Sequence, residues 1–241
     1  MSSGRTLFIS DLHLDEARPA IVERFEAFLR GVASGCDALY ILGDLFEAWA
    51  GDDGIDLELP ARVAAALRGA VARHPVAFMH GNRDFMVAKA FARATGVALL
   101  PDPTIIDLYG RRTALLHGDT LCTDDAAYQA FRTQVRDPAW QAGALARPLA
   151  ERLAMARQMR EGSEGAKQGK AMAIMDVAGG AVDAAFRALD CDVMIHGHTH
   201  RPARHDLVVD GRARTRWVLP DWYERGGYLE ATASGSRIAD F

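Results

Sequence analysis

The chain repeats one arrangement five times: a short apolar run leads into aspartate, histidine or asparagine, and in four of the five a glycine stands close by. The five junctions read "SDLHL", "LGDLFE", "HGNRDF", "LHGDT" and "HGHTH". Apolar runs of this length are typical of strands that are buried on both faces. Between the first three runs, segments 19–33 and 60–74 repeat apolar residues every three or four positions and open on Pro19 and Pro60. This spacing predicts helices that begin at the two prolines.

Alternating strands and helices predict an α/β fold of the α+β type, in which helices cover the faces of the sheets. Segment 104–118 predicts a hairpin that turns at Gly110, and the tail predicts antiparallel strands broken at Gly211 and Gly235. A chain of 241 residues is long enough for one large domain, or for a domain with an insertion. No uncharged apolar run approaches the roughly 18 residues of a membrane-spanning helix.

Residues 126–175 differ from the rest, and we expect them to form an inserted helical segment, called the cap below. We expect residues 1–125 and 176–241 to form the core. The cap has a helical period interrupted at Pro138 and Pro148. Its basic residues are Arg132, Arg136, Arg147, Arg152, Arg157, Arg160, Lys167 and Lys170, and its acidic residues are Asp137, Glu151, Glu161 and Glu164. This excess indicates either a solvated helical face or a basic, partly apolar binding surface.

The composition narrows the classes of partner. A formal net charge of -4 gives no argument for nucleic acid binding by the chain as a whole. Cys36, Cys122 and Cys191 lack the pair spacing of zinc sites and suit a reducing cytosol better than a disulfide framework. The start "MSSGRTLFIS" lacks the charged and apolar regions of a signal peptide. We therefore expect a cytoplasmic protein, with peripheral membrane attachment left open.

The polar junctions predict a metal site. Ligand sites gather beyond the carboxyl ends of strands in open α/β sheets. The candidate ligands are Asp11, His13, Asp44, Asn82, His117, His198 and His200. Carboxylates and imidazoles with one amide suit manganese, iron or zinc, and they contain too much nitrogen for a calcium cage. Asp11 and His13 are two positions apart, so on a strand or its extension they would share a face. Glycines 43, 81, 118 and 197 leave room for tight turns.

Each motif alone has an ordinary structural interpretation. An Asp-x-His pair is commonly a surface pair, "GNRD" suits a turn, and a histidine at a strand end is commonly just hydrogen-bonded. Arg83 could likewise form a surface salt bridge. The set of seven in this order is a different matter, because it suffices for two adjacent metals that share one bridging carboxylate.

Taken together, the five motifs resemble those of the calcineurin-like metallophosphoesterases. The resemblance implies a β-sandwich flanked by helices, with the cap inserted. It implies that Asp11, His13 and His200 hold one metal, that Asn82, His117 and His198 hold the other, and that Asp44 bridges them. Asn82, Arg83 and His198 are the implied catalytic residues at the phosphate. Asp84 and Asp119 would orient ligands or arginines, and His196 is left without a metal to bind.

Longer stretches narrow the resemblance to one bacterial branch of that family. They are "CDALYILGDLFEAWAGDD", "LHGDTLCTDDAAYQAFR", "AIMDV" and "IHGHTHRPA". Members of this branch use manganese to cleave UDP-2,3-diacylglucosamine into UMP and 2,3-diacylglucosamine 1-phosphate (lipid X) during lipid A synthesis. The implied cofactors are two Mn²⁺ ions. The implied substrate contacts are Asn82, Arg83, Asp125, Ser163, Lys167, Lys170 and His198. The cap would hold the acyl chains, and its basic face would favour the cytoplasmic leaflet of the inner membrane.

The sequence departs from this branch in two places. Lys167 stands where some relatives carry a small polar amide, and the tail "VLPDWYERGGYL" differs from the commoner form. We assign the tail no chemistry and expect Trp217 and Trp222 to pack in the core. Two other functions remain: a metallophosphoesterase that cleaves a nucleotide diester or phosphoprotein, and a binding module on this fold without catalysis. The first would need no lipid groove, and the second would have lost ligands.

Overall fold

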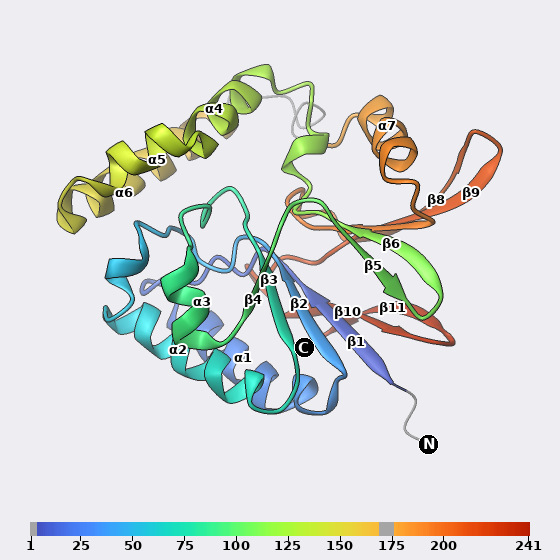
Figure 1. The fold of residues 1–241 in the computed structure, drawn as a ribbon, viewed down its shortest axis with the longest axis horizontal. Coiled ribbons are helices and arrows are strands. Elements are labelled where there is room, and N and C mark those ends of the chain that lie inside the picture. Colours follow the sequence, from blue (N-terminus) through green and yellow to red (C-terminus); the bar gives the residue numbers. More distant parts are fainter. Residues whose placement is uncertain (1–3, 169–175) are drawn as a thin grey trace.

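Two mixed β-sheets stacked face to face form the centre of the protein (Figure 1). The computed structural model describes residues 4–168 and 176–241, apart from the side chains of residues 161 and 163–168. One sheet has the strand order β11-β10-β1-β2-β3-β4 and the other β5-β6-β7-β9-β8. The strands are β1 (Arg5–Ile9), β2 (Ala38–Leu42), β3 (Val76–Met79), β4 (Ala98–Leu100), β5 (Thr104–Leu108), β6 (Arg111–Leu115), β7 (Val193–His196), β8 (Ala203–Val209), β9 (Arg212–Val218), β10 (Gly227–Thr232) and β11 (Gly235–Asp240).

The centre of each sheet is parallel, which brings several strand ends to one edge. In the larger sheet β1, β2, β3 and β4 pair in parallel, and in the smaller one β6, β7 and β9 do so. Helices α1 (Pro19–Arg30), α2 (Glu58–Val71) and α3 (Lys89–Thr95) make the crossovers of the larger sheet, and α7 (Gly179–Leu189) precedes β7. The segments after β1, β2, β3, β6 and β7 can therefore meet.

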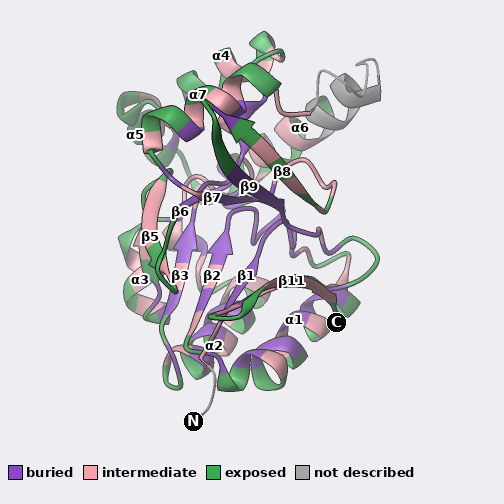
Figure 2. Cartoon of the chain, turned by 90° about the vertical axis from the view of Figure 1, so that its right-hand side faces the viewer, coloured by how far each residue is buried: buried purple, intermediate pink, exposed green. Residues whose placement is uncertain are grey.

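Alternation along the strands builds a layered core. On β1, Leu7 belongs to the cluster that packs against α1 and α2, whereas Phe8 faces the second sheet. On β6, Leu115 joins the layer between the sheets and Ala114 the layer beneath α7. Figure 2 shows the resulting buried strands between partly exposed helices. A strand that is covered on both faces needs apolar residues at successive positions, so it appears in the sequence as a continuous apolar run.

The cap helices α4 (Ala126–Arg136), α5 (Pro138–Leu145) and α6 (Leu149–Gln168) lie beyond the carboxyl ends of β1, β2 and β3 (Figure 1). The predicted interruptions at Pro138 and Pro148 are confirmed. Pro138 begins α5, where a missing N–H costs nothing, and the Asp137 side chain accepts hydrogen bonds from the N–H groups of Ala139 (2.8 Å) and Trp140 (3.0 Å). These junctions divide residues 126–168 of the cap into three helices.

Most predicted elements are present, with differences at their ends. Helix α1 begins at Pro19 as expected, whereas α2 begins at Glu58, two residues before Pro60. The hairpin of β5 and β6 turns at Tyr109 and Gly110, which have φ values of 53° and 82°. Helices α3 and α7 and strand β4 were not predicted. Among the described residues, no helix is long and apolar enough to cross a membrane.

Candidate metal centre and the cavity beside it

The seven predicted ligands all lie at one edge of the sandwich, in the segments that follow β1, β2, β3, β6 and β7. The first two segments run side by side. The N–H of Asp11 donates to the carbonyl of Gly43 at 3.1 Å, and the N–H of His13 donates to that of Asp44 at 2.9 Å. This pairing continues the sheet's parallel register beyond the end of the strands and sets the ligands opposite one another.

Most of the ligands occupy the left-handed region of backbone conformation. The φ values are 55° for Asp11, 49° for His13, 53° for Asp44, 69° for His198 and 54° for His200. Asp11 and His13 do face one cluster, as expected, but strand alternation is not the cause. Strand β1 ends at Ile9, and the left-handed turns, not strand alternation, aim the two side chains. Such conformations are strained for residues other than glycine and concentrate at functional sites.

One cluster consists of Asp11, His13 and His200. The Nε2 atom of His200 lies 3.4 Å from Oδ1 of Asp11 and 3.4 Å from Nε2 of His13. One ligand atom from each residue lies within 4.8 Å of the other two. The structure thus brings together the three residues predicted for one metal.

A second cluster consists of Asn82, His117 and His198. The Oδ1 atom of Asn82 lies 3.1 Å from Nε2 of His117 and 2.9 Å from Nδ1 of His198. Between the clusters, Oδ2 of Asp44 lies 3.8 Å from Nε2 of His117 and also 3.8 Å from Nε2 of His13. Asp11, Asp44 and His117 form a further group with a compatible spacing of ligand atoms. Asp44 is therefore placed between both sets, as a bridging ligand would be.

The residues present fit divalent cations. Asp11 Oδ1 is buried and accepts no hydrogen bond from the described residues; its nearby polar atom is His200 Nε2 at 3.4 Å, and an ionised oxygen in such a position needs compensation. Burial lowers the pKa of His117, but Asp44, Asp119 and Asp11 outweigh it and raise the pKa to about 9. The pocket around His117 therefore favours positive charge. Burial and the neighbouring His117 lower the pKa of His198 to about 4, which keeps its ring neutral, as metal ligation requires.

Two glycines allow the backbone to approach the carboxylates. A Cβ atom on Gly81 would lie 2.0 Å from Oδ1 of Asp44, and one on Gly197 would lie 2.2 Å from Oδ2 of Asp11. Either contact is far inside van der Waals distance. These positions need glycine because the loop passes directly over a ligand. The glycines predicted beside the site therefore act here by letting the backbone approach the carboxylates closely.

Asp84 and Asp119 support the site from behind. Asp84 accepts hydrogen bonds from the N–H groups of Leu45 (2.7 Å) and Gly81 (2.8 Å), so it ties the loop after β2 to the loop after β3. Burial and the neighbouring Asp44 raise the pKa of Asp84 to about 7. Asp119 accepts from Tyr128 Oη at 2.6 Å and from Arg132 Nε at 2.7 Å, both on α4. It therefore joins the cap to the segment that carries His117.

The third histidine of "HGHTH", His196, has both ring nitrogens engaged away from the clusters. Its Nε2 accepts from Nη1 of Arg216 at 2.9 Å, and its Nδ1 donates to the carbonyl of Gly197 at 2.8 Å. Burial and the Arg216 charge lower the pKa of His196 to about 3. A neutral ring with both nitrogens bonded has no atom left for a metal, which agrees with the expectation from the sequence.

Sequence reasoning missed three residues that contact the predicted ligands. Glu47 Oε2 lies 3.1 Å from Nδ1 of His13, and Asp221 Oδ2 lies 3.4 Å from Nδ1 of His200. The ring of Tyr223 stacks on that of His13 at 5.1 Å between centroids. The interpretation of the tail as chemically silent is thus corrected. Trp217 and Trp222 are buried, as expected, with Trp222 packed against Phe25 and Phe28. Glu47 stands inside "LGDLFE" and could have been found there, whereas the tail carries no comparable signal.

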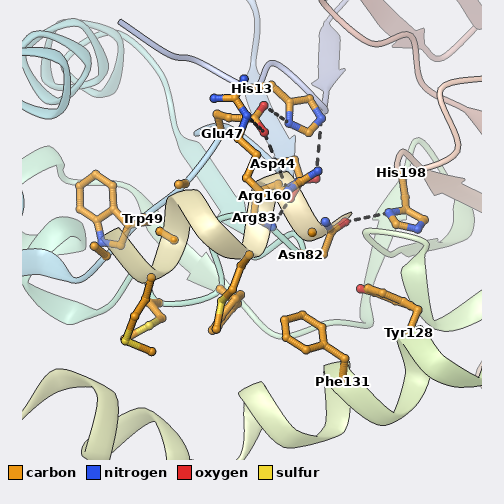
Figure 3. Close-up of a pocket in the computed structure, with 18 of the residues that line it drawn as sticks. His13, Asp44, Glu47, Trp49, Asn82, Arg83, Tyr128, Phe131, Arg160 and His198 are labelled. Atoms are coloured by element: carbon orange, nitrogen blue, oxygen red, sulfur yellow. Dashed lines mark hydrogen bonds and ion pairs between the residues drawn. The ribbon is translucent and has the colours of Figure 1, made fainter. Parts of the chain in front are cut away.

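A cavity of about 790 Å³ opens beside the clusters, between the core and the cap (Figure 3). At one end it is lined by His13, Asp44, Asn82, Arg83 and His198. Its apolar lining comes from Trp49, Phe85 and Met86 on the core and from Tyr128, Phe131, Trp140, Ala144, Met155, Ala156 and Met159 on the cap. Asp125 also lines the cavity. Lys170 lies outside the described residues, and so do the side chains of Ser163 and Lys167.

The cap's arginines mainly hold it to the core. Arg136 donates to the carbonyl of Gly81 at 2.8 Å, and Nη1 of Arg160 lies 2.8 Å from Oδ2 of Asp15. Arg152, which is buried, pairs with Asp53 and donates to the carbonyl of Ala50. Arg147 and Arg157 remain exposed. Much of the positive charge of the cap is therefore used in contacts that hold the cap to the core. Only part of it is left for a basic binding surface.

Comparison with known proteins adds the family context. Residues 4–202 match the family model of the calcineurin-like phosphoesterases. A UDP-2,3-diacylglucosamine hydrolase of Xanthomonas campestris is 54% identical over 237 residues, which cover 95% of this chain and 96% of the relative. The protein of the same name from Stenotrophomonas maltophilia is 53% identical and covers 95% of this chain and 96% of the relative. A solved archaeal phosphodiesterase is 12% identical, with a TM-score of 0.49 over 98% of this chain and 99% of that one.

Proposed function

The chain belongs to the calcineurin-like phosphoesterases and, within them, to the UDP-2,3-diacylglucosamine hydrolase family, and from this membership we propose that it hydrolyses UDP-2,3-diacylglucosamine. The products are UMP and 2,3-diacylglucosamine 1-phosphate, as in lipid A biosynthesis. Residues 1–125 and 176–241 form the catalytic core, and residues 126–175 form the substrate cap.

The observation that carries this proposal is the continuity between the ligand clusters and the apolar cavity. A substrate with a diphosphate and two acyl chains needs a charged end and an apolar end within one space. The cavity has Arg83 and His198 at one end and Trp49, Trp140 and Met155 farther along it. An apolar lining contributes to binding free energy when it buries apolar substrate surface such as an acyl chain. A soluble nucleotide diester has no acyl chain, so this lining would not strengthen its binding.

The proposed metal assignment follows the two clusters. Asp11, His13 and His200 would hold one Mn²⁺, Asn82, His117 and His198 would hold the other, and Asp44 would be shared by both. When bound, such a pair lowers the pKa of a water molecule and neutralises phosphate oxygens. Carboxylate, imidazole and amide donors suit Mn²⁺ among other transition metals, and family membership favours it.

The chain's own residues position the substrate for in-line displacement at the α-phosphorus. Arg83 is placed by its N–H, which donates to Oδ1 of Asp44 at 2.8 Å, so its guanidinium stands beside the bridging carboxylate and binds phosphate oxygens. Asn82 and His198 contact the same phosphate. The oxygen of the attacking water bonds to the α-phosphorus, and the bond from that phosphorus to the bridging oxygen breaks. The sugar 1-phosphate leaves with the electron pair, and the proton lost by the attacking water passes to the solvent.

Contacts to the glucosamine phosphate are proposed for Asp125, Ser163, Lys167 and Lys170. The protein works in the cytoplasm at the inner leaflet of the inner membrane, held peripherally, and it needs no nucleic acid partner. Exposed Leu57 and Leu145 support this location, together with the cations of Arg147 and Arg157 on the cap.

Mass spectrometry of the products from UDP-2,3-diacylglucosamine tests the proposal, with Mn²⁺ added in one arm and chelator in the other. We expect UMP and lipid X in the first arm alone. Turnover of a generic aryl phosphodiester is the comparison. Equal efficiency on both substrates would contradict the lipid assignment in favour of a broader phosphoesterase, and no turnover of either would favour a non-catalytic binding module.

A further inference from the structure

Glu47 is a buried carboxylate where the metal clusters, the cavity and the cap meet (Figure 3). It follows Asp44 by three residues, and its N–H donates to the carbonyl of Leu14 at 3.1 Å. This bond fixes the Glu47 backbone against the loop that carries His13. None of the proposed ligand or substrate contacts uses this side chain.

One oxygen of Glu47 faces the metal cluster. Oε2 lies 3.1 Å from Nδ1 of His13 and accepts a hydrogen bond from Nη2 of Arg18 at 3.2 Å. The opposite nitrogen of His13, Nε2, faces His200 and Asp44. The carboxylate contacts Nδ1 by proximity without hydrogen-bond geometry, and it lies on the side of the ring opposite the cluster. Such partners set the tautomer and orientation of a metal-binding imidazole.

The other oxygen faces two guanidinium groups from different parts of the chain. Oε1 lies 3.9 Å from Nη1 of Arg83, on the core, and 3.6 Å from Nε of Arg160, on the cap helix α6. Both distances exceed hydrogen-bond length, so attraction between the charges acts without a fixed bond. One carboxylate thus lies between the His13 ring and the guanidinium groups of Arg83 and Arg160.

We propose that Glu47 is a positioning residue that couples the cap to the metal clusters. Through Oε2 it orients His13, and through Oε1 it holds Arg83 and Arg160 on the side where phosphate binds. A shift of the cap at Arg160 thereby moves the Glu47 carboxylate and changes the orientation of the His13 ring. The phosphate part of this role rests on the proposed function, whereas the contact with His13 does not.

The test is calorimetric titration of the metal-free chain with Mn²⁺. Replacing Glu47→Gln removes the charge, and we expect about tenfold weaker binding, as for the loss of other partners behind metal ligands. Glu47→Asp keeps the charge but shortens the side chain, and we expect similar weakening because the carboxylate no longer reaches Nδ1.

Glu26→Gln is the matched control. Glu26 accepts from Arg62 at 2.6 and 3.0 Å on the exposed side of α1, and its replacement leaves Mn²⁺ binding unchanged. Wild-type affinity in Glu47→Asp would overturn the positioning role.

A second arm tests the coupling from the cap. Removing a cation near a metal site should on electrostatic grounds tighten Mn²⁺ binding. Coupling through Glu47 predicts the reverse: Arg160→Gln weakens binding severalfold, with no further effect when combined with Glu47→Gln. Tighter binding in Arg160→Gln, or additive effects in the double variant, would contradict the coupling. Because Mn²⁺ binding needs no substrate, these results stand apart from lipid turnover, whose failure would reject the proposed function instead.

Discussion

Arg152 on α6 and Asp53 on the core form a two-point ion pair, with Arg152 Nη1 lying 2.8 Å from Oδ1 of Asp53. The guanidinium is buried although its partner carboxylate is 58% exposed. The pair therefore ties α6 to the core at a second point, eight positions before Arg160, which pairs with Asp15. An ion pair with one exposed partner adds little stability, about 1 kcal/mol or less, so its main contribution is to the cap's position.

We expect Arg152→Met to raise the KM for UDP-2,3-diacylglucosamine severalfold, because the cap wall of the cavity loses its anchor. Turnover of a small aryl phosphodiester, which does not need that wall, should stay unchanged. Steady-state kinetics on both substrates checks this. Arg187→Met, at an exposed pair with Asp210, is the control. Equal losses on both substrates would point to damage at the metal site instead.

Asp44→Ala should abolish hydrolysis, with a loss well beyond the roughly 100-fold seen when an outer partner of a metal ligand is removed. Asp44 is the carboxylate that reaches both His13 and His117, so its loss affects both clusters. Metal content and turnover are the measurements. Asp240→Ala, on the exposed end of β11, is the control. Substantial activity in the Asp44 variant would rule out the two-metal assignment.

Gly81→Ala should damage the site without changing any ligand. The new methyl group would lie 2.0 Å from Asp44 Oδ1 and 2.3 Å from its backbone nitrogen, so the two loops must separate. We expect a stability loss of about 1–3 kcal/mol, as in other overpacked sites, together with weaker metal binding. Gly180→Ala, where a Cβ would meet nothing within 4 Å, is the matched control. Urea unfolding and metal titration of both variants make the comparison.

His196 should make the metal-free protein sensitive to acid. Its folded pKa of about 3 lies below the ordinary value of 6.5, so the unfolded chain takes up a proton first as the pH falls. The group's contribution to stability is complete above pH 6.5 and declines towards pH 3, by up to about 1.4 kcal/mol per pH unit.

Unfolding in urea with chelator present, at several pH values from 7 to 4, measures this slope. We expect His196→Gln to flatten it, and the variant should still bind both metals because His196 is not a ligand. His205→Gln, on a partly exposed ring of β8, should change the slope less. A wild-type slope in His196→Gln, or loss of both metals, would contradict the role assigned to this residue.

The sequence was sufficient to predict the long buried strands and the set of ligands, but not the short elements or the orientation of the ligand side chains. Strands such as β1 and β7 are buried on both faces, so a continuous apolar run revealed them. Helix α3, seven residues long, and strand β4, three residues long, are too short for periodicity to mark them. The ligand set could be recognised from residue type and order. The orientation of the Asp11 and His13 side chains could not be recognised from the sequence. It depends on left-handed turns that form when the backbone pairs with Gly43 and Asp44.

Contacts between distant segments were equally hidden. Nothing in the local sequence around Asp221 indicates that it lies against His200, because a tail segment reaches the site only after the strands around it have assembled. The cap arginines show the same limit. Their charge was visible, but their use in docking depended on where Asp15, Asp53 and Asp119 lie in the folded core.

The cavity has one wall on the core, with Trp49 and Met86, and one on the cap, with Trp140 and Met155. Acyl chains between these walls would add a layer of hydrophobic core between two parts of the chain that already meet through ion pairs, hydrogen bonds and the ring contact of Phe85 with Trp140. The bound lipid is then a structural element as well as a reactant. Melting temperature should rise on binding of the lipid product in proportion to the apolar area covered, and cleavage alone, which leaves both chains in place, should release little of that stabilisation.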